Sequence, residues 1–457
     1  MQNNQSIQKN PQAIVIGGSM AGLLAARVLS EQFERVTIVD RDQLPLTAEP
    51  RRGVPQSVQP HVLMTKGYRV LEEFFPGIGK DIQAAGAVPL DWGKDFLFFQ
   101  QGSWMPVSET AVGLESYTCS RPLLESQVRQ RVKQIPNVEF MPGQRVVGLC
   151  GDRNTIQGVR LQQGSLAPQD YFAQLVVDAS GRSSQAPQWL KDLDIAPPSA
   201  MVIDPGVGYA TRRYRIPAEF QPRCKVLLIS QEPPDQPRLG YLAEVENQEW
   251  IATLGGYGQH YPPLEGEGFL QFAQQLANPA FYQAIAHAQP LSPIRAHRAT
   301  ANRLYHYEKI ELPSGFVALG DAVCALCPVH GQGITVSALS ALVLQRWLQQ
   351  PQQRRSLSLK DASLKGASLK GASFQKQLAQ SNAFPWAMAT GFDSKFVTTK
   401  GAISPNWVAK LFQGYTGRLS ERALHDRELQ LQFIEMAHML KPPSVLFHPR
   451  LVWRALF

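Results

Sequence analysis

Three short segments rich in glycine, each placed directly after an apolar run, constrain this 457-residue chain more than any other feature. They are 17–22 (GGSMAG), 178–181 (DASG) and 320–321 (GD), the last followed by the glycine-rich loop 328–334 (PVHGQGI). Apolar runs that end in such turns are typical of the parallel strands of an open α/β sheet. Because ligands bind at the carboxyl ends of these strands, the three segments predict one extended site built from distant parts of the chain.

The first segment has the layout of a phosphate-binding turn between a strand and a helix. Glycine permits a tight turn and a close approach of the backbone, and the helix N-terminus offers N–H donors to a phosphate. A second apolar run, 36–39, ends in Asp40, at the distance where an acid binds the ribose hydroxyls of an adenosine. Ser19 stands where the usual motif has its middle glycine, so the backbone approach is tighter there. An ordinary strand-to-helix turn is the alternative interpretation, which Asp40 disfavours.

The other two segments place an aspartate at the end of an apolar strand. Asp178 ends one such run and Asp321 follows another, so both are expected at the carboxyl edge of the sheet. The loop 328–334 leads into a helical pattern at 335–348, whose N-terminus points to whatever the loop binds. At a flavin, this positive helix end would meet N1 and the C2 carbonyl, where negative charge collects on reduction.

In their order along the chain, these segments resemble those of the FAD-dependent monooxygenases with the para-hydroxybenzoate hydroxylase fold, especially the squalene-epoxidase-like and polyether-epoxidase-like relatives. The resemblance covers residues 11–350. It implies an α/β (α+β, two-lobed) fold, in which a Rossmann-like FAD-binding domain carries an antiparallel-sheet substrate domain. A C-terminal helical extension follows.

The resemblance also implies which residues contact FAD. Arg121, in SRPLL at 120–124, matches an arginine near the cofactor, and Arg52 lies in the segment 51–56, which resembles a mobile arginine-glycine loop. A surface arginine and a solvated basic loop are the respective alternatives. The expected cofactor contacts are Gly17, Ser19, Met20, Ala21, Gly22, Asp40, Arg41, Arg52, Arg121, Val146, Asp178, Gly181, Gly320, Asp321, Pro328, Gly331, Gly333 and Ile334.

Changes in the pattern of apolar, aromatic and turn residues along the chain predict the division into domains. Short strand-like runs separated by turns lie between 207 and 256, and an aromatic-rich stretch at 88–107 is expected to join them as a sheet over the flavin. The expected parts are an FAD-binding domain in three pieces (11–87, 108–185 and 295–350), a substrate-domain hairpin (88–107), a substrate domain (186–294), a linker (351–380) and a C-terminal helical extension (381–457).

The linker contains four copies of a five-residue pattern at 356–375 (SLSLK, DASLK, GASLK, GASFQ), which resemble pentapeptide repeats. Four copies make only about one coil of a solenoid, too few to form a stable domain. Beyond them, one helix is expected at 420–440. The basic, apolar end 446–457 is expected to pack over the core, with weak peripheral membrane contact as the alternative.

Composition narrows the function classes. A net charge of +8 favours anionic partners such as NADPH, but the basic residues are spread along the chain and no nucleic-acid module is present. Five scattered cysteines suit a reducing compartment, and the first residues lack the features of a signal peptide, so a cytoplasmic location is expected. The CxxC spacing at 324–327 is interpreted as buried apolar filler, with a redox dithiol as the alternative.

The resemblance implies that NADH or NADPH reduces FAD, that dioxygen then forms a flavin C4a-(hydro)peroxide, and that one oxygen atom passes to an apolar organic substrate by hydroxylation or epoxidation. His330 is the candidate catalytic residue, for proton handling, and no metal site is expected. Halogenation is disfavoured because no Trp-x-Trp-x-Ile-Pro segment lies between 185 and 260. A geranylgeranyl-reductase-type alkene reductase and a non-catalytic flavin-binding redox module remain as alternatives.

Overall fold

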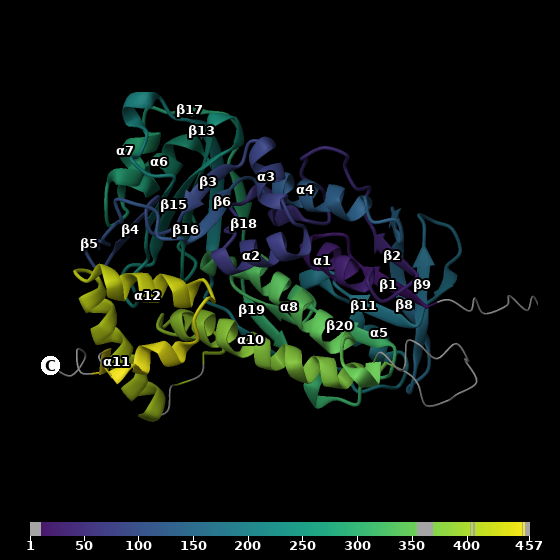
Figure 1. Ribbon diagram of the computed structural model, residues 1–457. Helices are drawn as coiled ribbons and strands as arrows, with labels where there is room; N and C mark the ends of the chain where they lie inside the picture. The colour runs from purple at the N-terminus through teal and green to yellow at the C-terminus, as the bar shows by residue number, and fades with distance from the viewer. Residues whose placement is uncertain (1–10, 354–368, 403, 405–406, 450, 453–457) are drawn as a thin grey trace, which may run out of the picture.

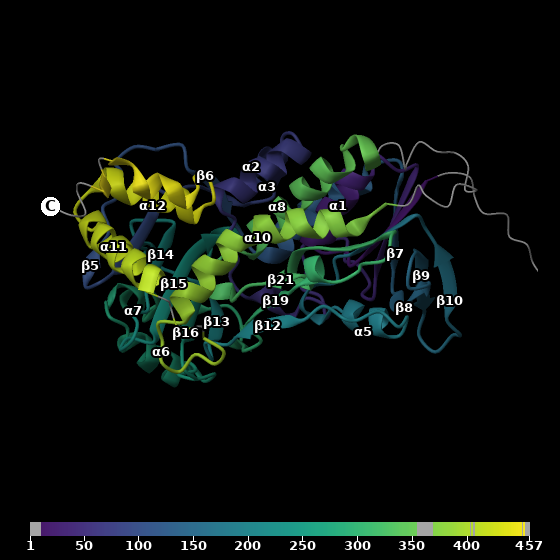
Figure 2. The same cartoon turned by 90° about the horizontal axis from the view of Figure 1, so that it is seen from below.

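The computed structural model describes residues 11–353, 369–402, 404, 407–449 and 451–452. Figures 1 and 2 show two lobes, one built on a parallel sheet and one on a larger, mainly antiparallel sheet, with yellow C-terminal helices beside the second lobe. This arrangement confirms the predicted α/β, two-lobed fold.

The first lobe contains a five-stranded sheet in which every neighbouring pair is parallel. Four of its strands, all but the one at residues 138–142, are almost wholly buried, as expected of a parallel sheet covered on both faces. Ile16 lies opposite both Val39 and Asp178, which brings the ends of the first two predicted strands to the same edge as Asp178. The order is β20 (Phe316–Ala318), β11 (Leu175–Asp178), β1 (Gln12–Ile16), β2 (Arg35–Asp40) and β7 (Val138–Pro142).

Helices from the start, middle and end of the chain pack together against this sheet. α8 contacts α1, α2 and α10, and α1 also contacts α4. These helices are α1 (Met20–Leu29), α2 (Thr65–Phe74), α4 (Arg121–Lys133), α8 (Gly333–Leu348) and α10 (Gly371–Asp393).

The second lobe contains an eight-stranded sheet whose centre is the expected antiparallel meander. The sheet is mixed, however, because β14 pairs with β4 in parallel. The predicted hairpin 88–107 also divides, since β3 (Val88–Asp91) pairs with β6 (Glu115–Thr118) in a separate ribbon. The order is β17 (Gln289–Pro290), β13 (Gly208–Arg215), β16 (Glu249–Gly256), β15 (Arg238–Val245), β14 (Val226–Ile229), β4 (Phe96–Gln100) and β5 (Ser103–Trp104), with β18 (Arg295–His297) also on β13.

Smaller elements complete the two lobes. Two three-stranded sheets comprise β8 (Arg145–Gly151), β9 (Ile156–Gln162) and β10 (Gln169–Phe172), and β12 (Ala200–Ile203), β19 (Asn302–Tyr305) and β21 (Cys324–Ala325). The further α-helices are α3 (Ile78–Ala84), α5 (Ala186–Lys191), α6 (Gly266–Gln274) and α7 (Ala280–Ile285). Short 3-10 helices are η1 (Pro55–Val58), η2 (Gly181–Ser183), η3 (Ala218–Phe220), η4 (Glu246–Gln248), η5 (Tyr307–Lys309), η6 (Gly320–Ala322), η7 (Pro328–His330) and η8 (Pro443–Phe447).

The C-terminal extension begins earlier than predicted. α10 starts at Gly371, so the fourth five-residue copy is helical and not part of a linker that reaches residue 380. Phe374 is fully buried, and the side chain of Trp347 donates to Ser373 at 2.9 Å, which fixes the start of α10 against α8. Most of the other three copies lie outside the described residues.

The single helix predicted at 420–440 is wrong. The structure has two helices, α11 (Trp407–Ala423) and α12 (Arg427–Ala437), because Asp426 interrupts the helix and its carboxylate accepts from the backbone N–H of Leu429 as an N-cap. Within the described residues, no helix is long and apolar enough to cross a membrane.

Candidate active site

The three glycine-rich segments meet at the carboxyl edge of the parallel sheet. Gly17 has φ +102°, and a Cβ atom there would lie 2.6 Å from the carbonyl oxygen of Ala179. A Cβ atom on Gly22 would overlap the carbonyl oxygen of Gly17, and one on Gly320 would lie 2.8 Å from the Cβ of Ala21. Glycine is therefore required at these three positions, because backbone atoms crowd Gly17 and Gly22, and the side chain of Ala21 crowds Gly320, which also has φ +61°.

Ser19, in the place of the middle glycine, has a role of its own. It is the N-cap residue of α1, but its side chain makes no capping bond to that helix. Its hydroxyl instead donates to Glu125 at 2.6 Å and accepts from Arg121 at 2.8 Å. The serine therefore ties the turn to α4 and leaves the helix N-terminus uncapped by its hydroxyl, as a phosphate site requires.

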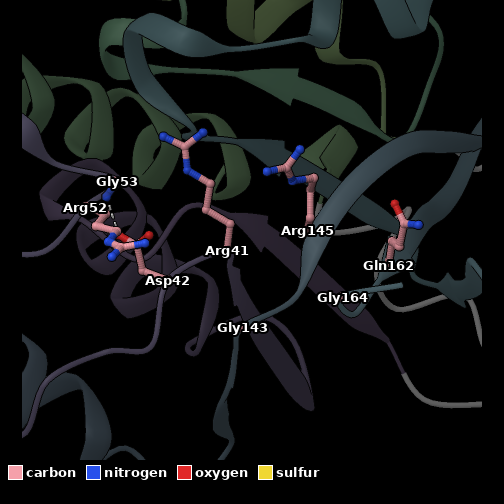
Figure 3. A pocket seen from close by; sticks show the side chains of 8 residues that line it. All are labelled: Arg41, Asp42, Arg52, Gly53, Gly143, Arg145, Gln162 and Gly164. Carbon is pink, nitrogen blue, oxygen red and sulfur yellow. Dashed lines mark hydrogen bonds between the residues drawn. The ribbon is translucent and has the colours of Figure 1, made fainter. Parts of the chain in front are cut away.

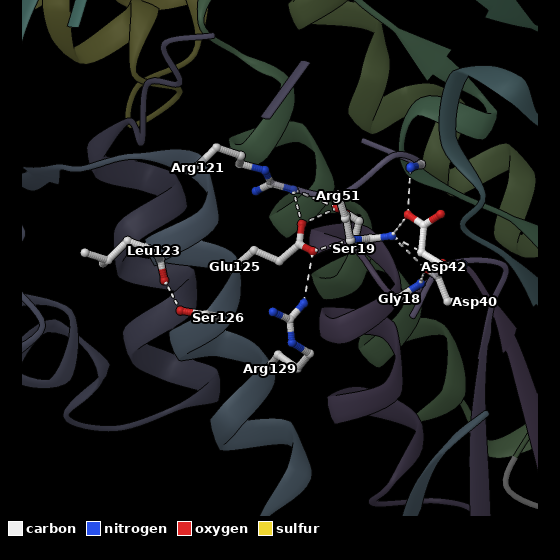
Figure 4. Close-up of polar contacts among 11 residues, drawn as sticks. Gly18, Ser19, Asp40, Asp42, Arg51, Arg121, Leu123, Glu125, Ser126 and Arg129 are labelled. Carbon is white, nitrogen blue, oxygen red and sulfur yellow. Dashed lines mark hydrogen bonds and ion pairs between the residues drawn. The ribbon is translucent and has the colours of Figure 1, made fainter. Parts of the chain in front are cut away.

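A buried charge network surrounds this turn (Figure 4). Glu125 lies at its centre and pairs with Arg51 at 3.1 Å, Arg121 at 3.0 Å and Arg129 at 3.2 Å. Arg51 also contacts Asp40 at 3.2 Å and Asp42 at 2.9 Å. Burial opposes the charge of Glu125, but Arg121 and Arg51 hold the pKa of its carboxyl below the ordinary value.

Two guanidinium nitrogens in this network have no hydrogen-bond partner within the described part of the chain. They are Nη2 of Arg51 and Nη1 of Arg121, and both are buried. An unpaired buried N–H of a charged group costs free energy, so each atom is suited to an anion that the protein itself does not provide. With the uncapped end of α1, these donors fit the pyrophosphate of FAD.

Asp40 and Asp178 hold different positions at the sheet edge. Asp40 accepts from the backbone N–H of Gly18 at 2.7 Å, which holds its carboxylate beside the first turn. Asp178 is fully buried and accepts from the hydroxyls of Ser180 and Ser184, and burial raises the pKa of its carboxyl. Asp178 therefore shapes its own loop, which continues through Gly181 at φ +79°.

The third segment places an aspartate and a glycine turn at the same edge of the parallel sheet. The Asp321 side chain is 32% exposed and lies 3.8 Å from Nε of Arg182, while Arg121 lies close enough to act on its charge. Gly331 has φ +65°, and a Cβ atom there would lie 2.9 Å from Val62. Gly333 opens α8, and a Cβ atom there would meet nothing within 4 Å, so the start of this helix is not crowded.

The loop packs against the end of the large antiparallel sheet through an apolar cluster. Cys327 and Val329 lie with residues from or beside β13, β15 and β16, together with Phe396 of the C-terminal extension. Cys324 and Cys327 are buried and unpaired, as the filler interpretation predicts, and burial raises the pKa of Cys324 to about 12. The cluster comprises Val207, Tyr209, Leu239, Tyr257, Cys327 and Phe396, with Val329 and Phe392 packed on it.

Arg41 and Arg52 lie apart from the buried network, at a polar cavity of about 590 Å³ (Figure 3). Figure 3 shows Arg41 and Arg145 extended in the same direction. Val146, the residue after Arg145 on β8, does not line this cavity and packs on the apolar core of the first lobe. The cavity is lined by Arg41, Asp42, Arg52, Gly53, Gly143, Arg145, Gln162 and Gly164.

The remaining predicted residues lie as follows. Met20 and Ile334 are buried at the starts of α1 and α8, and Pro328 begins η7, which ends at His330. The His330 ring is 13% exposed and pairs with Asp393.

Sequence reasoning missed five charged residues around the site. Glu125 follows Arg121 by four positions on one helix, a spacing that could have indicated the pair. Arg129 follows Glu125 by the same spacing, and Arg51 lies in the segment 51–56 although its pairing with Glu125 spans 74 positions. No local signal points to Arg182 or Asp393, because their partners are distant in the sequence. The missed residues are Arg51, Glu125, Arg129, Arg182 and Asp393.

Known proteins resemble the chain in both sequence and structure. It is 34% identical to Protein Rv3254 of Mycobacterium tuberculosis over 351 aligned residues. The alignment covers 74% of this chain and 73% of that protein. It is 24% identical to squalene epoxidase 1 of Arabidopsis thaliana over 350 aligned residues. That alignment covers 74% of this chain and 59% of that protein. No model of a protein family matches the chain.

Solved structures with the same fold include the flavin-dependent brominase Bmp2, with a TM-score of 0.65, 13% identity and coverage of 93% of this chain and 92% of that one. p-Nitrophenol 4-monooxygenase PnpA of Pseudomonas putida has a TM-score of 0.60, 14% identity and coverage of 93% and 97%. Together with the convergence of the three glycine-rich segments, these likenesses identify the chain as an oxidoreductase. The chain belongs to the same family as Protein Rv3254, and it has the fold of the FAD-dependent monooxygenases related to para-hydroxybenzoate hydroxylase.

Proposed function

We propose that the chain is an NAD(P)H-dependent monooxygenase that hydroxylates or epoxidises an apolar organic molecule with dioxygen. The observation that carries the proposal is the meeting of the three glycine-rich segments beside two unpartnered guanidinium nitrogens, with an apolar cluster over the adjacent loop. The first two features suit a flavin dinucleotide, and the third suits a substrate without charge.

The predicted site residues divide according to the part of FAD that each would bind. Gly17, Ser19 and Gly22, with Arg51 and Arg121, form the anion-binding end of the site and would hold the pyrophosphate. Asp40 and Val146 would take the adenosine, with Met20 and Ala21 at the start of α1. Asp321 with Gly320 would hold the ribityl chain, near Asp178 and Gly181, and Pro328, Gly331, Gly333 and Ile334 would lie against the ring. When bound, FAD supplies electron transfer from NADH or NADPH and the activation of dioxygen.

The polar cavity supports a nicotinamide nucleotide as the electron donor. Arg41, Arg52 and Arg145 line it, and three guanidinium groups at one cavity attract the phosphates of NADH or NADPH. Arg145→Ala is expected to raise KM for the nucleotide and to leave FAD content unchanged. A loss of FAD with unchanged KM would assign the cavity to the flavin instead.

The apolar cluster supports a substrate that is bound without water. Val207, Tyr209 and Leu239 from the large sheet pack directly on Cys327 and Val329 of the loop. Such a lining excludes solvent from the reacting atoms and gives no counter-charge to an ionic ligand. We therefore propose an apolar substrate class.

The test is a set of measurements on the purified chain. It should take up FAD without a covalent bond, and Asp321→Ala should weaken that binding. NAD(P)H oxidation should consume dioxygen, increase with an apolar ligand, and place label from ¹⁸O₂ in the product. A folded chain that takes up no FAD would overturn the proposal, and anaerobic turnover to a saturated product would assign it to alkene reduction.

The C-terminal helices support a weak peripheral contact with a membrane surface. Trp407 and Leu411 on α11 and Phe447 are 74%, 66% and 53% exposed. Exposed aromatic and aliphatic side chains on a helix favour the interface of a bilayer. Co-sedimentation with anionic vesicles that Trp407→Ser abolishes would support this contact, and equal sedimentation of both chains would contradict it. Part of the predicted segment 446–457 lies outside the described residues.

A further inference from the structure

Asp393 is a fully buried carboxylate that none of the three glycine-rich segments contains. It is the last residue of α10, in the C-terminal extension. Its Oδ1 lies 2.9 Å from Nε2 of His330 and accepts from the Tyr257 hydroxyl at 2.9 Å. Its Oδ2 accepts from the Asn302 amide at 2.7 Å. Four segments that are distant in the sequence therefore converge on one carboxylate beside the loop 328–334.

The charge of this carboxylate identifies its principal partner. An ionised carboxylate buried without a counter-charge is strongly destabilising. Among the described residues, the basic side chain within ion-pair distance of Asp393 is that of His330, which is a cation only when both ring nitrogens are protonated. Tyr257 and Asn302 add neutral hydrogen bonds. The arrangement thus favours an imidazole that keeps a proton on Nε2 and donates it to Asp393.

The ring of His330 is held on one edge and open on the other. Its side chain is 13% exposed, and the Phe392 ring contacts it edge-on at 5.8 Å between centroids. The structure records no hydrogen bond to Nδ1 of His330 from any described residue. Because Nδ1 and Nε2 point in different directions, a proton fixed on Nε2 leaves Nδ1 available to a ligand.

The other titratable groups in this cluster are unsuited to proton transfer near neutral pH. Burial, reinforced by the charge of Asp393, raises the pKa of Cys327 and of Tyr257 well above their ordinary values. Burial raises the pKa of Tyr209 in the same way, with Cys327 and Asp393 adding to the effect. These three groups stay protonated and neutral. Arg182 and Asp204 are the remaining charged groups that act on Cys327, and Arg182 is a permanent cation.

We propose that Asp393 is a positioning residue that fixes the tautomer of His330, so that Nδ1 of His330 moves a proton in the reaction chamber. The proposal rests on the proposed function, whose overall reaction for hydroxylation is RH + O₂ + NAD(P)H + H⁺ → ROH + H₂O + NAD(P)⁺. Nδ1 of His330, which is unprotonated in this tautomer, first takes a proton from solvent and gives an imidazolium beside Asp393. Nδ1 then passes that proton to the oxygen atom that leaves as water, and the neutral ring is restored. His330 is then the catalytic residue, and α10 completes the site.

The first experiment reads the tautomer and does not depend on turnover. ¹⁵N spectra of histidine-labelled protein, with the His330 signal assigned by its loss in His330→Gln, should show Nε2 protonated and Nδ1 unprotonated at high pH. Asp393→Asn should convert this to a mixture of tautomers. Asp170→Asn, an Asp on β10 that pairs with Arg160 at the surface, is the matched control and should leave the spectrum unchanged.

The second experiment separates proton transfer from structural support. The Gln side chain in His330→Gln can still donate to Asp393 but cannot exchange a proton, so turnover should fall about 10²-fold or more at full FAD content. Asp393→Asn should lower turnover about 10-fold to 100-fold, as expected for the partner that orients a functional histidine. The pH profile of turnover should differ between the wild-type chain and His330→Gln, because an amide side chain does not exchange a proton with the substrate site.

Each alternative outcome has a distinct meaning. A tautomer that is unchanged in Asp393→Asn overturns the positioning role, whatever the reaction. Cys327, His330 and Asp393 also have ligand atoms within 4.8 Å of one another, so a bound transition metal that disappears in His330→Gln would overturn the proposal in favour of a metal site. A changed tautomer in Asp393→Asn without any oxygen consumption by the wild-type chain would sustain the positioning role and reject the monooxygenase function.

Discussion

Arg51 contacts three carboxylates at the edge of the parallel sheet. Its guanidinium contacts Asp40, Asp42 and Glu125, and all four side chains are between 6 and 13% exposed. Burial alone would lower the pKa of Arg51, but Glu125 and Asp40 raise it above the ordinary value. The network is therefore stable as a complete set, and the loss of one cation leaves buried negative charge without a partner.

Arg51→Met removes this cation and keeps most of the side-chain length. Breaking a buried pair costs about 3–5 kcal/mol of stability, so the free energy of unfolding in urea should fall by that amount. FAD should also bind at least about tenfold more weakly, because a charged donor to the pyrophosphate is lost. Arg160→Met, at an exposed ion pair on β9, is the control and should change neither quantity. Unchanged FAD affinity in Arg51→Met would place the pyrophosphate elsewhere.

Gly22→Ala tests the close approach of backbones in the first turn. The new Cβ would overlap the carbonyl oxygen of Gly17, so the turn must open and FAD content after purification should fall. Gly414→Ala is the matched control, because a Cβ there meets nothing within 4 Å on the exposed helix α11. That substitution should stabilise the chain by about 0.5–1 kcal/mol. Normal FAD content in Gly22→Ala would contradict the role of the turn.

At the scale of elements, α10 belongs to the core of the first lobe. It packs on α8 and β20, with Phe374 fully buried in the same apolar core as Trp347. Phe374→Ala should therefore lower the free energy of unfolding by about 3–5 kcal/mol. Phe172→Ala, on β10 with 58% of the side chain exposed, should have a far smaller effect in the same urea titration. Equal effects would show that α10 is only loosely attached.

The sequence predicts the parallel strands well, because strands buried on both faces consist of almost continuous apolar runs. β1, β2, β11 and β20 all lie within or beside the runs that precede the predicted turns. The extension is predicted less well. The five-residue period at 371–375 conceals the start of α10, and an N-cap at Asp426 interrupts a pattern that is apolar on both sides. In both places a local signal is outweighed by tertiary packing or a single cap.

In the candidate site, too, some residues are predictable from the sequence and others are not. Gly17, Gly22 and Asp40 are predictable because turn, helix and acid follow one another within one strand–helix–strand unit. The contacts of Arg51 with Glu125 and of His330 with Asp393 join residues 74 and 63 positions apart. No periodicity or spacing rule reports such pairs, because only the fold brings them together. The predicted FAD contacts themselves await the binding measurements described above.

At the scale of the whole molecule, the C-terminal extension holds the two lobes through a buried histidine. His438, at the end of α12, accepts at Nδ1 from the backbone N–H of Thr65 at 3.2 Å. Its ring contacts Trp92 edge-on at 5.0 Å between centroids. Thr65 starts α2 in the first lobe, and α12 also packs on the large sheet through the cluster of Trp92 and Phe96. This contact therefore depends on a neutral imidazole.

Acid should lower the free energy of unfolding through the protonation of His438. Burial lowers the pKa of His438 from 6.5 to about 3, and burial with the nearby charge of Arg121 lowers that of His61 equally. The unfolded chain binds these protons first, so stability is complete above pH 6.5 and is lost as the pH falls toward 3. At two pH units below 6.5, each histidine should have cost about 2.7 kcal/mol.

His438→Asn tests this account, because the Asn oxygen can accept from Thr65 but does not titrate. The free energy of unfolding, measured in urea from pH 8 to pH 4, should fall less steeply with acid than in the wild-type chain, by up to about 1.4 kcal/mol per pH unit. His61 still titrates, so some acid dependence should remain. The values at pH 8, where both histidines are neutral, provide the control for any packing defect. An acid slope equal to that of the wild-type chain would show that His438 takes up its proton in the folded protein as readily as in the unfolded chain, and that the junction between α12 and α2 does not rest on a neutral ring.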